Sequence, residues 1–214
     1  MADEPKNFST RALWAGHLPP VAGEDVATPI HHSVTFGYYD MDEWFDVALD
    51  RKPGHIYSRN TNPTVRPLEV TMSSLEGSEE AVSFSTGMAA ISNTLYTLLE
   101  PGDRAVAIKD TYGGTNKIFL EFLPRMKVDC CLCDTLDFDT IEEEVRKGCK
   151  LLYLETPTNP LLKVVDIERL ARVAHEVGAL VIVDNTFATM VNQRPLELGA
   201  DIVLYSATKY INGH

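Results

Sequence analysis

Two ionisable side chains follow short apolar runs near the end of this 214-residue sequence. Asp184 comes after Val181-Ile-Val183, and Lys209 comes after a run that begins at Ile202. Runs of this length are typical of buried strands, and an open α/β sheet binds ligands at the carboxyl edge of its strands. An amine can capture a carbonyl group, and a carboxylate can keep a ring nitrogen protonated. The pair therefore indicates a cofactor that carries both groups, which is the chemistry of pyridoxal phosphate.

A predicted turn between a strand and a helix contains Gly87 and Met88. The N–H groups at the start of a helix bind anions, phosphate above all, and glycine lets the backbone approach closely. The hydroxyls of Ser206 and Thr208 could donate to the same phosphate. Such turns are common, so this one favours a phosphate site only together with the other residues. No G-x-G-x-x-G or G-x-x-x-x-G-K-[ST] motif is present, which argues against dinucleotides and nucleoside triphosphates.

Tyr112 and Asn159 follow two further predicted strands. The aromatic ring could stack on a flat cofactor, and the amide could hydrogen-bond a phenolic oxygen. Each also has an ordinary structural explanation, as a strand-end tyrosine and as part of a Pro-rich turn. Asp184 could likewise cap a helix or bind a metal, and Lys209 could be a solvated side chain. Their occurrence on successive strand ends favours one shared site over these separate explanations.

Predicted helices and strands alternate from residue 57 onward. The predicted helices cover residues 63–76, 86–98, 115–123, 139–147 and 166–178, and the predicted strands cover residues 80–84, 105–108, 128–133, 151–154, 179–183 and 202–205. Asp139 and Asp166 are the expected N-caps of the last two helices, and Gly77 is an expected C-cap. This alternation predicts an α/β fold of three layers, with a mostly parallel sheet covered by helices on both faces.

Residues 1–55 lack this alternation. They contain Pro19, Pro20 and Pro29 together with scattered aromatic residues, and they allow one short helix after Asp42. An apolar segment without its own core must pack on another surface. We therefore expect an irregular N-terminal arm that contacts a neighbouring subunit.

Charge and cysteine usage restrict the class of protein. Nineteen basic and thirty-one acidic residues give a net charge of −12, which disfavours nucleic acid and anionic membranes as partners. No apolar run approaches the roughly 18 residues of a membrane span, and the N-terminus lacks the pattern of a signal peptide. Three of the four cysteines crowd one predicted strand, without the spacing of a zinc site. We expect reduced thiols, no metal and a cytoplasmic location.

Several motifs together resemble one family. Ser206-Ala-Thr-Lys209-Tyr-Ile-Asn-Gly-His214, preceded by Asp184-Asn-Thr186, is similar to the lysine signature of the Cys/Met-metabolism (trans-sulfuration) family of pyridoxal-phosphate enzymes. Residues 57–64, 85–88, 112–115 and 155–160 match further family motifs in the same order. The resemblance implies that residues 56–214 form the large domain of a fold-type I enzyme, which ends after the lysine and lacks the C-terminal small domain.

The resemblance also implies roles for single residues. The catalytic residues would be Lys209, Tyr112 and Asp184. Lys209 would bond covalently to the cofactor and then move protons, Asp184 would pair with the pyridine nitrogen, and Tyr112 would stack on the ring. The full set of implied cofactor-binding residues is Tyr57, Arg59, Gly87, Met88, Tyr112, Asn159, Asp184, Ser206, Thr208 and Lys209.

Within that set, Asn159 would contact the phenolic oxygen, and Gly87, Met88, Ser206 and Thr208 would hold the phosphate. Tyr57 and Arg59 would serve the site of a neighbouring subunit. The resemblance therefore implies a homo-oligomer, usually a dimer of dimers.

The expected activity is γ-elimination or γ-replacement on sulfur-containing amino acids or homoserine esters, of the cystathionine γ-lyase or γ-synthase type. Methionine γ-lyase and O-acetylhomoserine sulfhydrylase are alternatives. Methionine γ-lyases usually carry a cysteine at the position of Gly114, which favours the cystathionine enzymes. Family members are close to twice this length, and their substrate-binding arginine lies in the additional part. A non-catalytic truncated paralogue, which binds the cofactor or a full-length partner, is therefore an alternative from another class.

Overall fold

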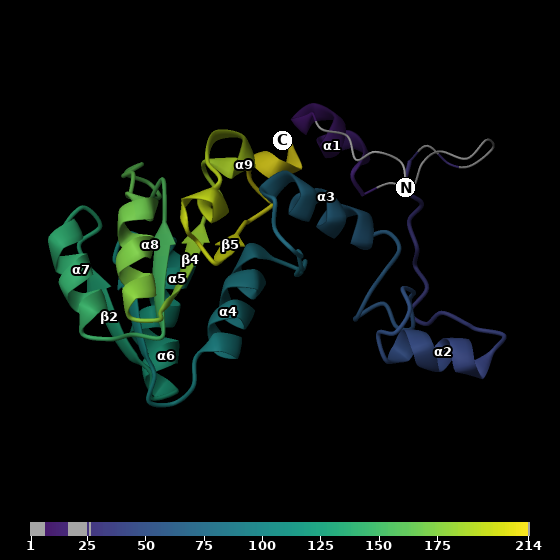
Figure 1. Cartoon of the computed structure of the whole chain (residues 1–214), viewed down its shortest axis with the longest axis horizontal. Helices are drawn as coiled ribbons and strands as arrows, with labels where there is room; N and C mark the ends of the chain where they lie inside the picture. Colours follow the sequence, from purple (N-terminus) through teal and green to yellow (C-terminus); the bar gives the residue numbers. More distant parts are fainter. Residues whose placement is uncertain (1–6, 17–24, 26, 214) are drawn as a thin grey trace. The chain divides into compact units, whose positions relative to one another are not determined.

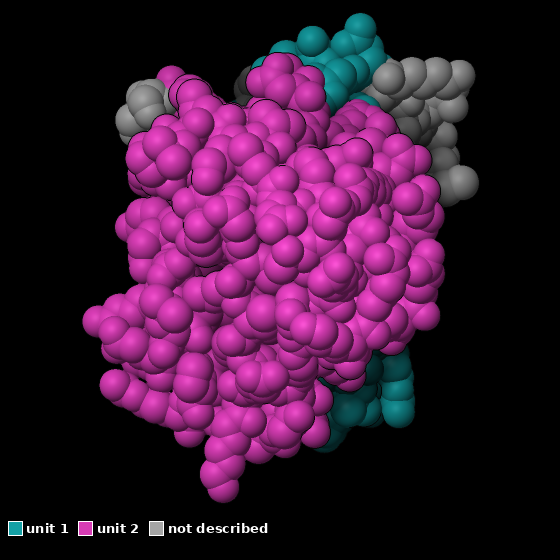
Figure 2. Space-filling view, turned by 90° about the vertical axis from the view of Figure 1, so that its left-hand side faces the viewer, with its two compact units in different colours: residues 1–83 teal, residues 84–214 magenta. Residues whose placement is uncertain are grey.

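The computed structural model describes residues 7–16, 25 and 27–213. The chain divides into two compact units, residues 1–83 and residues 84–214 (Figure 2). The expected arm of residues 1–55 and its boundary at residue 56 stay predictions. Pro19 and Pro20 of that arm lie outside the described residues.

Residues 84–214 contain a parallel sheet of five strands. The strands are β1 (Arg104–Ile108), β2 (Asp129–Cys133), β3 (Leu151–Glu155), β4 (Leu180–Asp184) and β5 (Ile202–Leu204). Their order in the sheet is β2-β1-β3-β4-β5. The α/β class and the parallel sheet are thus as predicted. In the register of β3 and β4, Glu155 is paired with Asp184, so that both carboxylates end neighbouring strands.

Helices cover both faces of this sheet (Figure 1). Helices α7 (Phe138–Arg146) and α8 (Ile167–Glu176) pack on one face, with a core that includes Ile141, Leu152 and Leu170. Helix α4 (Gly87–Leu98) and the segment made of α5 (Gly113–Lys117), η1 (Ile118–Phe122) and α6 (Leu123–Arg125) pack on the other. The core of that second face includes Leu95, Phe119, Tyr153 and Ile182. Short turns of helix follow β4 and β5, at α9 (Thr189–Asn192), η2 (Pro195–Leu198) and η3 (Tyr210–Asn212).

One predicted cap is wrong and two are confirmed. Asp137 caps α7, because its side chain accepts the Thr140 N–H at 3.1 Å, whereas Asp139 lies in the first turn. Asp166 caps α8 as predicted, through the Arg169 N–H at 3.0 Å. Gly77 ends its helix in the left-handed conformation, with φ of 77°.

Residues 1–83 contain α1 (Phe8–Trp14), α2 (Met41–Ala48) and α3 (Arg66–Glu76). The helix predicted from residue 63 begins at Arg66, because residues 63–65 form a turn in which the Asn62 carbonyl accepts the Val65 and Arg66 N–H groups. Thr35 and Tyr57 form an isolated antiparallel bridge.

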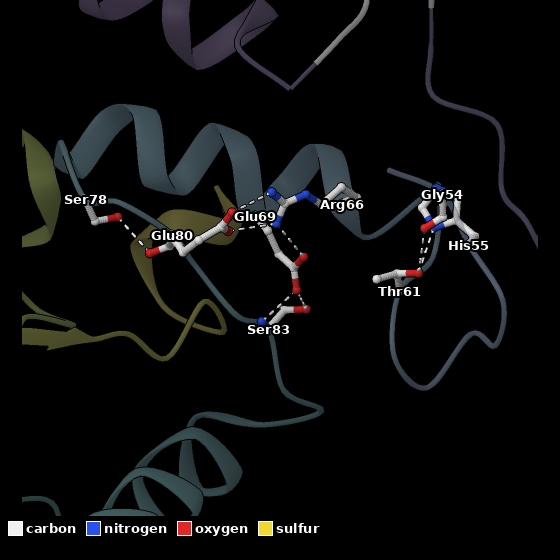
Figure 3. A network of polar contacts seen from close by, with 8 residues as sticks. All are labelled: Gly54, His55, Thr61, Arg66, Glu69, Ser78, Glu80 and Ser83. Atoms are coloured by element: carbon white, nitrogen blue, oxygen red, sulfur yellow. Dashed lines mark hydrogen bonds and ion pairs between the residues drawn. The ribbon is translucent and has the colours of Figure 1, made fainter. Parts of the chain in front are cut away.

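The strand predicted at residues 80–84 is absent. No described residue forms a β-ladder with this segment. Instead, two carboxylates hold its ends against α3 (Figure 3). Arg66 makes two hydrogen bonds to Glu80 at 2.9 and 2.8 Å, and Glu69 accepts both the N–H and the hydroxyl of Ser83 at 2.9 Å. Val82 remains 73% exposed. An apolar run forms a strand only when a neighbouring strand satisfies its backbone groups, and the described residues offer residues 80–84 no such neighbour.

The four cysteines are free, with Cys133 buried and the other three half-buried, and their reduced state stays a prediction. Burial raises the pKa of Cys130 to about 11 and the pKa of Cys133 to about 12, so both thiols are protonated at neutral pH. In the described part of the chain, no helix is long and apolar enough to cross a membrane.

Candidate functional site

A cavity of about 400 Å³ opens at the carboxyl edge of the sheet. Its walls come from the turns that follow β1, β3, β4 and β5 and from the start of α4, and all of them belong to residues 84–214. Eight residues predicted from the sequence line it: Gly87, Met88, Tyr112, Asn159, Asp184, Ser206, Thr208 and Lys209. Their individual roles stay predictions. Six residues outside the predicted set also line it: Thr86, Ile91, Glu155, Pro157, Thr186 and Phe187.

The start of α4 provides free backbone donors. Thr86 caps the helix, since its hydroxyl oxygen accepts the Ala89 N–H at 3.0 Å. Gly87 and Met88 are the first two residues after this cap, and their N–H groups have no intrahelical acceptor, as in the first turn of any helix. Together with the helix dipole they suit an anion.

Gly87 lies very close to Ser206. A Cβ atom built at Gly87 would lie 2.8 Å from the Ser206 Cβ and 3.0 Å from its Oγ. The missing side chain therefore lets the serine hydroxyl approach the start of α4. The Ser206 N–H donates to the Thr186 hydroxyl at 2.8 Å, which holds this turn beside the end of β4. The N–H groups of Gly87 and Met88 and the Ser206 hydroxyl, which we call the anion cradle, thus lie at the start of α4 and suit a phosphate-sized anion.

We predict that Gly87→Ala destabilises the chain by about 1–3 kcal/mol, because the new methyl group collides with Ser206. In a helix without that contact, the same change stabilises by roughly 0.5–1 kcal/mol. Gly113→Ala is the matched control, since Gly113 also begins a helix but has nothing within 4 Å of its built Cβ. Urea unfolding of both variants measures the difference. Equal effects at the two positions would contradict the close approach to Ser206.

Asp184 is a buried carboxylate without a cationic partner. It is 6% exposed, and it accepts the Thr186 N–H at 3.0 Å. No ion pair involves it among the described residues. Burial raises the pKa of this carboxyl, and the hydrogen bonds from Thr186 oppose that shift. A buried carboxylate requires a donor or a cation, so the cavity suits a ligand that presents a protonated ring nitrogen here.

The Tyr153 phenol lies behind Asp184. The tyrosine is fully buried on β3, and its pKa is raised, first by burial and then by the nearby Asp184 and Glu155 carboxylates. Its hydroxyl has no hydrogen bond of standard geometry, although it interacts with both Asp184 and Thr115. The phenol thus gives Asp184 a buried polar neighbour from the adjacent strand, β3.

Glu155 lies at the end of β3 and is 6% exposed. Its Oε2 accepts the Tyr112 N–H at 2.6 Å, and its Oε1 accepts the Asn159 N–H at 3.3 Å. Burial raises the pKa of Glu155 to about 7, with a further contribution from Asp184, while the two N–H donors oppose the shift. An acidic residue that ends a fully apolar run was the sequence signal for this site, and it is the same signal that identified Asp184.

Tyr112 and Lys209 are exposed, as are Thr86, Asn159 and Thr208 in the wall of the same cavity. The Tyr112 side chain is 49% exposed and follows β1. A Cβ at Gly114 would lie 2.7 Å from the Met88 Sδ and 3.1 Å from the Tyr112 ring, so this glycine lets Met88 and Tyr112 pack together. Lys209 lies at the start of η3, and no described carboxylate forms an ion pair with it.

Tyr57 and Arg59 belong to residues 1–83. The Arg59 guanidinium lies over the Tyr57 ring, 5.8 Å from its centroid. The two residues thus form a pair of their own, and their contribution to any site stays a prediction.

The fold and the cavity define an α/β protein with an anion cradle, a buried carboxylate and an accessible amine at the carboxyl edge of a parallel sheet. Comparison with known proteins then gives the family. The chain belongs to the Cys/Met metabolism PLP-dependent enzymes, whose family profile matches residues 9–214.

Relatives of known name include both lyases and synthases. An L-methionine γ-lyase of Fusobacterium nucleatum subsp. polymorphum is 43% identical over 208 residues, which are 97% of this chain and 52% of that protein. A cystathionine γ-lyase of Bacillus subtilis (strain 168) is 42% identical over 182 residues, 85% of this chain and 48% of that protein. The chain thus spans about half the length of these curated relatives.

Solved structures confirm the fold class. The crystal structure of metB from Corynebacterium glutamicum has a TM-score of 0.89 at 38% identity, and the match covers 98% of this chain and 52% of that one. A putative O-acetylhomoserine (thiol)-lyase from Campylobacter jejuni, solved with N'-pyridoxyl-lysine-5'-monophosphate, has a TM-score of 0.90 at 27% identity. That match covers 97% of this chain and 51% of the other.

Proposed function

We propose that this chain binds pyridoxal phosphate and forms the cofactor-binding part of an enzyme that breaks or makes carbon–sulfur bonds at the γ-carbon of amino acids. The observation that carries the proposal is the cavity in which Asp184, Lys209 and the start of α4 meet. The buried Asp184 carboxylate, which forms no ion pair among the described residues, suits a protonated ring nitrogen, and the anion cradle suits a phosphate. The family supports the same cofactor.

Bound pyridoxal phosphate would supply a carbonyl group for an amine and a protonated ring that accepts an electron pair from the substrate Cα. The N–H groups of Gly87 and Met88 and the hydroxyls of Ser206 and Thr208 would hold the phosphate. Asp184 would accept the ring N–H and keep that nitrogen protonated. Tyr112 would pack on the ring face, and Asn159 would donate to the phenolic oxygen.

Lys209 would hold the cofactor through its Nζ until a substrate amine displaces it. The released amine is then free to act as a base. It would take the proton of the substrate Cα. Removal of a second proton, from Cβ, would then let the γ-substituent leave with its bonding electron pair. Addition of a thiol would complete γ-replacement, and hydrolysis would give a 2-oxo acid and ammonia.

The proposed substrates are cystathionine, homoserine esters and methionine. Gly114 favours the cystathionine enzymes, whereas methionine γ-lyases are among the relatives with the highest identity. We therefore propose cystathionine and methionine lyase activities alike. We also propose that the chain acts in the sulfur amino-acid metabolism of the cytoplasm.

We further propose a homo-oligomer, as a dimer of dimers, in which Tyr57 and Arg59 contact the phosphate bound by a neighbouring subunit. The net charge of −12 supports this arrangement, because an anionic cofactor on an acidic chain needs a local cation. No carboxylate pairs with Arg59 in the part of the chain that the structure describes, so its guanidinium is available for a phosphate.

The test uses the purified 214-residue chain. It is incubated with pyridoxal phosphate, and release of ammonia and 2-oxo acid is then measured with cystathionine, methionine and cysteine in turn. We expect a yellow protein with one cofactor per chain and product from at least one substrate. A yellow protein without product would instead support a non-catalytic paralogue that binds the cofactor, and no cofactor uptake would contradict the proposed function.

A further inference from the structure

Glu155 joins two separate turns of the cavity wall. One carboxylate oxygen accepts the N–H of Tyr112, which follows β1, and the other accepts the N–H of Asn159, which follows β3. The first bond is short, at 2.6 Å, and the second is 3.3 Å long. A single buried side chain therefore fixes the backbone of both residues.

The position of Glu155 in the sheet explains why it can reach both turns. Side chains alternate between the faces of a strand, so Tyr153 and Glu155 point to the same face of β3. Glu155 and Asp184 are register partners, and their side chains therefore lie side by side on the face covered by α4 and α5. From there Glu155 lies between the start of α5 and the turn after its own strand.

We propose that Glu155 is a positioning residue of the cofactor site, which sets the separation of Tyr112 and Asn159 so that one packs on the cofactor ring while the other reaches its phenolic oxygen. This inference rests on the proposed function. Glu155 acts through the two residues it holds, since both of its oxygens accept backbone N–H groups.

The chemistry of the site supports this role over simple packing. The position is almost fully buried beside a second carboxylate, where an apolar side chain would avoid the cost of desolvating an acid. A backbone N–H that turns inward needs an acceptor, however, and two such groups point at this position. The carboxyl group satisfies both, and it leaves the side chains of Tyr112 and Asn159 free for a ligand.

The experiment compares Glu155→Ala, Glu155→Gln and Glu155→Met with the wild-type chain. The glutamine keeps the shape and one oxygen acceptor, whereas the methionine fills the space without an acceptor and so avoids a cavity. Glu144→Gln is the matched control, because Glu144 binds Arg104 at the start of β1, at the opposite edge of the sheet. Two quantities are measured: amide hydrogen exchange at Tyr112 and Asn159 without cofactor, and the Kd for pyridoxal phosphate from its yellow absorbance.

We expect exchange at both amides to accelerate about tenfold in Glu155→Ala and Glu155→Met, and the Kd to rise by a similar factor, as the loss of both buried hydrogen bonds implies. Glu155→Gln should stay within about threefold of the wild type, and Glu144→Gln should equal it. Unchanged exchange in the alanine and methionine variants would overturn the inference. So would faster exchange with an unchanged Kd. Failure of the wild-type chain to take up the cofactor would overturn the proposed function, whereas the exchange data are independent of cofactor.

Discussion

Lys209→Ala is expected to abolish both the yellow absorbance of the cofactor-bound chain and its turnover. Lys209 is the accessible amine of the cavity, and the proposal gives it both the covalent bond to the cofactor and the proton transfers. Loss of a general base alone lowers the rate by about 10²- to 10⁴-fold. Loss of the covalent bond adds to this effect, so turnover should fall by at least that factor.

Absorbance titration with pyridoxal phosphate and the product assay measure these losses. Lys109→Ala is the control, because Lys109 also follows a strand at this edge but forms an exposed ion pair with Asp134. Exposed pairs contribute about 0–1 kcal/mol, so this variant should bind cofactor normally. A yellow spectrum that survives in Lys209→Ala would contradict the assignment of this lysine.

Asp184→Asn is expected to have opposite effects on the two states of the chain. Without cofactor, the variant should be more stable at pH 8 by about 1–3 kcal/mol, because it removes a buried carboxylate that has no cationic partner. With cofactor, it should bind about 10- to 150-fold more weakly, since a charge-assisted hydrogen bond contributes about 1.5–3 kcal/mol.

The raised pKa of Asp184 also predicts how the free energy of unfolding changes with pH. Burial raises the pKa of Asp184 in the folded chain, so the folded chain holds this proton more tightly than the unfolded chain does. The free energy of unfolding therefore falls as the pH rises from the unfolded pKa, near 3.9, through the raised folded pKa. Asp184→Asn should show a shallower fall in urea unfolding across this range. A variant that is less stable than the wild type at pH 8 without cofactor would show that the carboxylate already has a stabilising partner.

Much of the fold could be predicted because local signals and tertiary structure agree. The runs 105–108, 128–133, 151–154, 179–183 and 202–205 are apolar and flanked by turn residues, and all of them became parallel strands. The segment at residues 80–84 is the exception. Residues 80–84 carry the same type of pattern, yet a strand also needs a hydrogen-bonding neighbour, and sequence composition says nothing about whether one is available. The Arg66–Glu80 and Glu69–Ser83 contacts that hold this segment instead are long-range side-chain pairings.

The candidate site followed from a rule of topology. In a parallel sheet the residues just after each strand meet at one edge, so the sequence alone places Asp184, Tyr112 and Lys209 together. Glu155 obeys the same rule, but within its turn the amide of Asn159 is the more obvious ligand for a phenolic oxygen. Its importance lies in two backbone hydrogen bonds, and the sequence does not reveal which N–H groups turn inward.

The most direct test of the central claim identifies the lysine that bonds to the cofactor. The wild-type chain is incubated with pyridoxal phosphate, the product is reduced with borohydride to make the bond permanent, and the modified peptide is sequenced by mass spectrometry. The account predicts one pyridoxyl group per chain, on Lys209, and none in the Lys209→Ala variant. Modification of another lysine, such as Lys163, or the absence of any stable modification would contradict it.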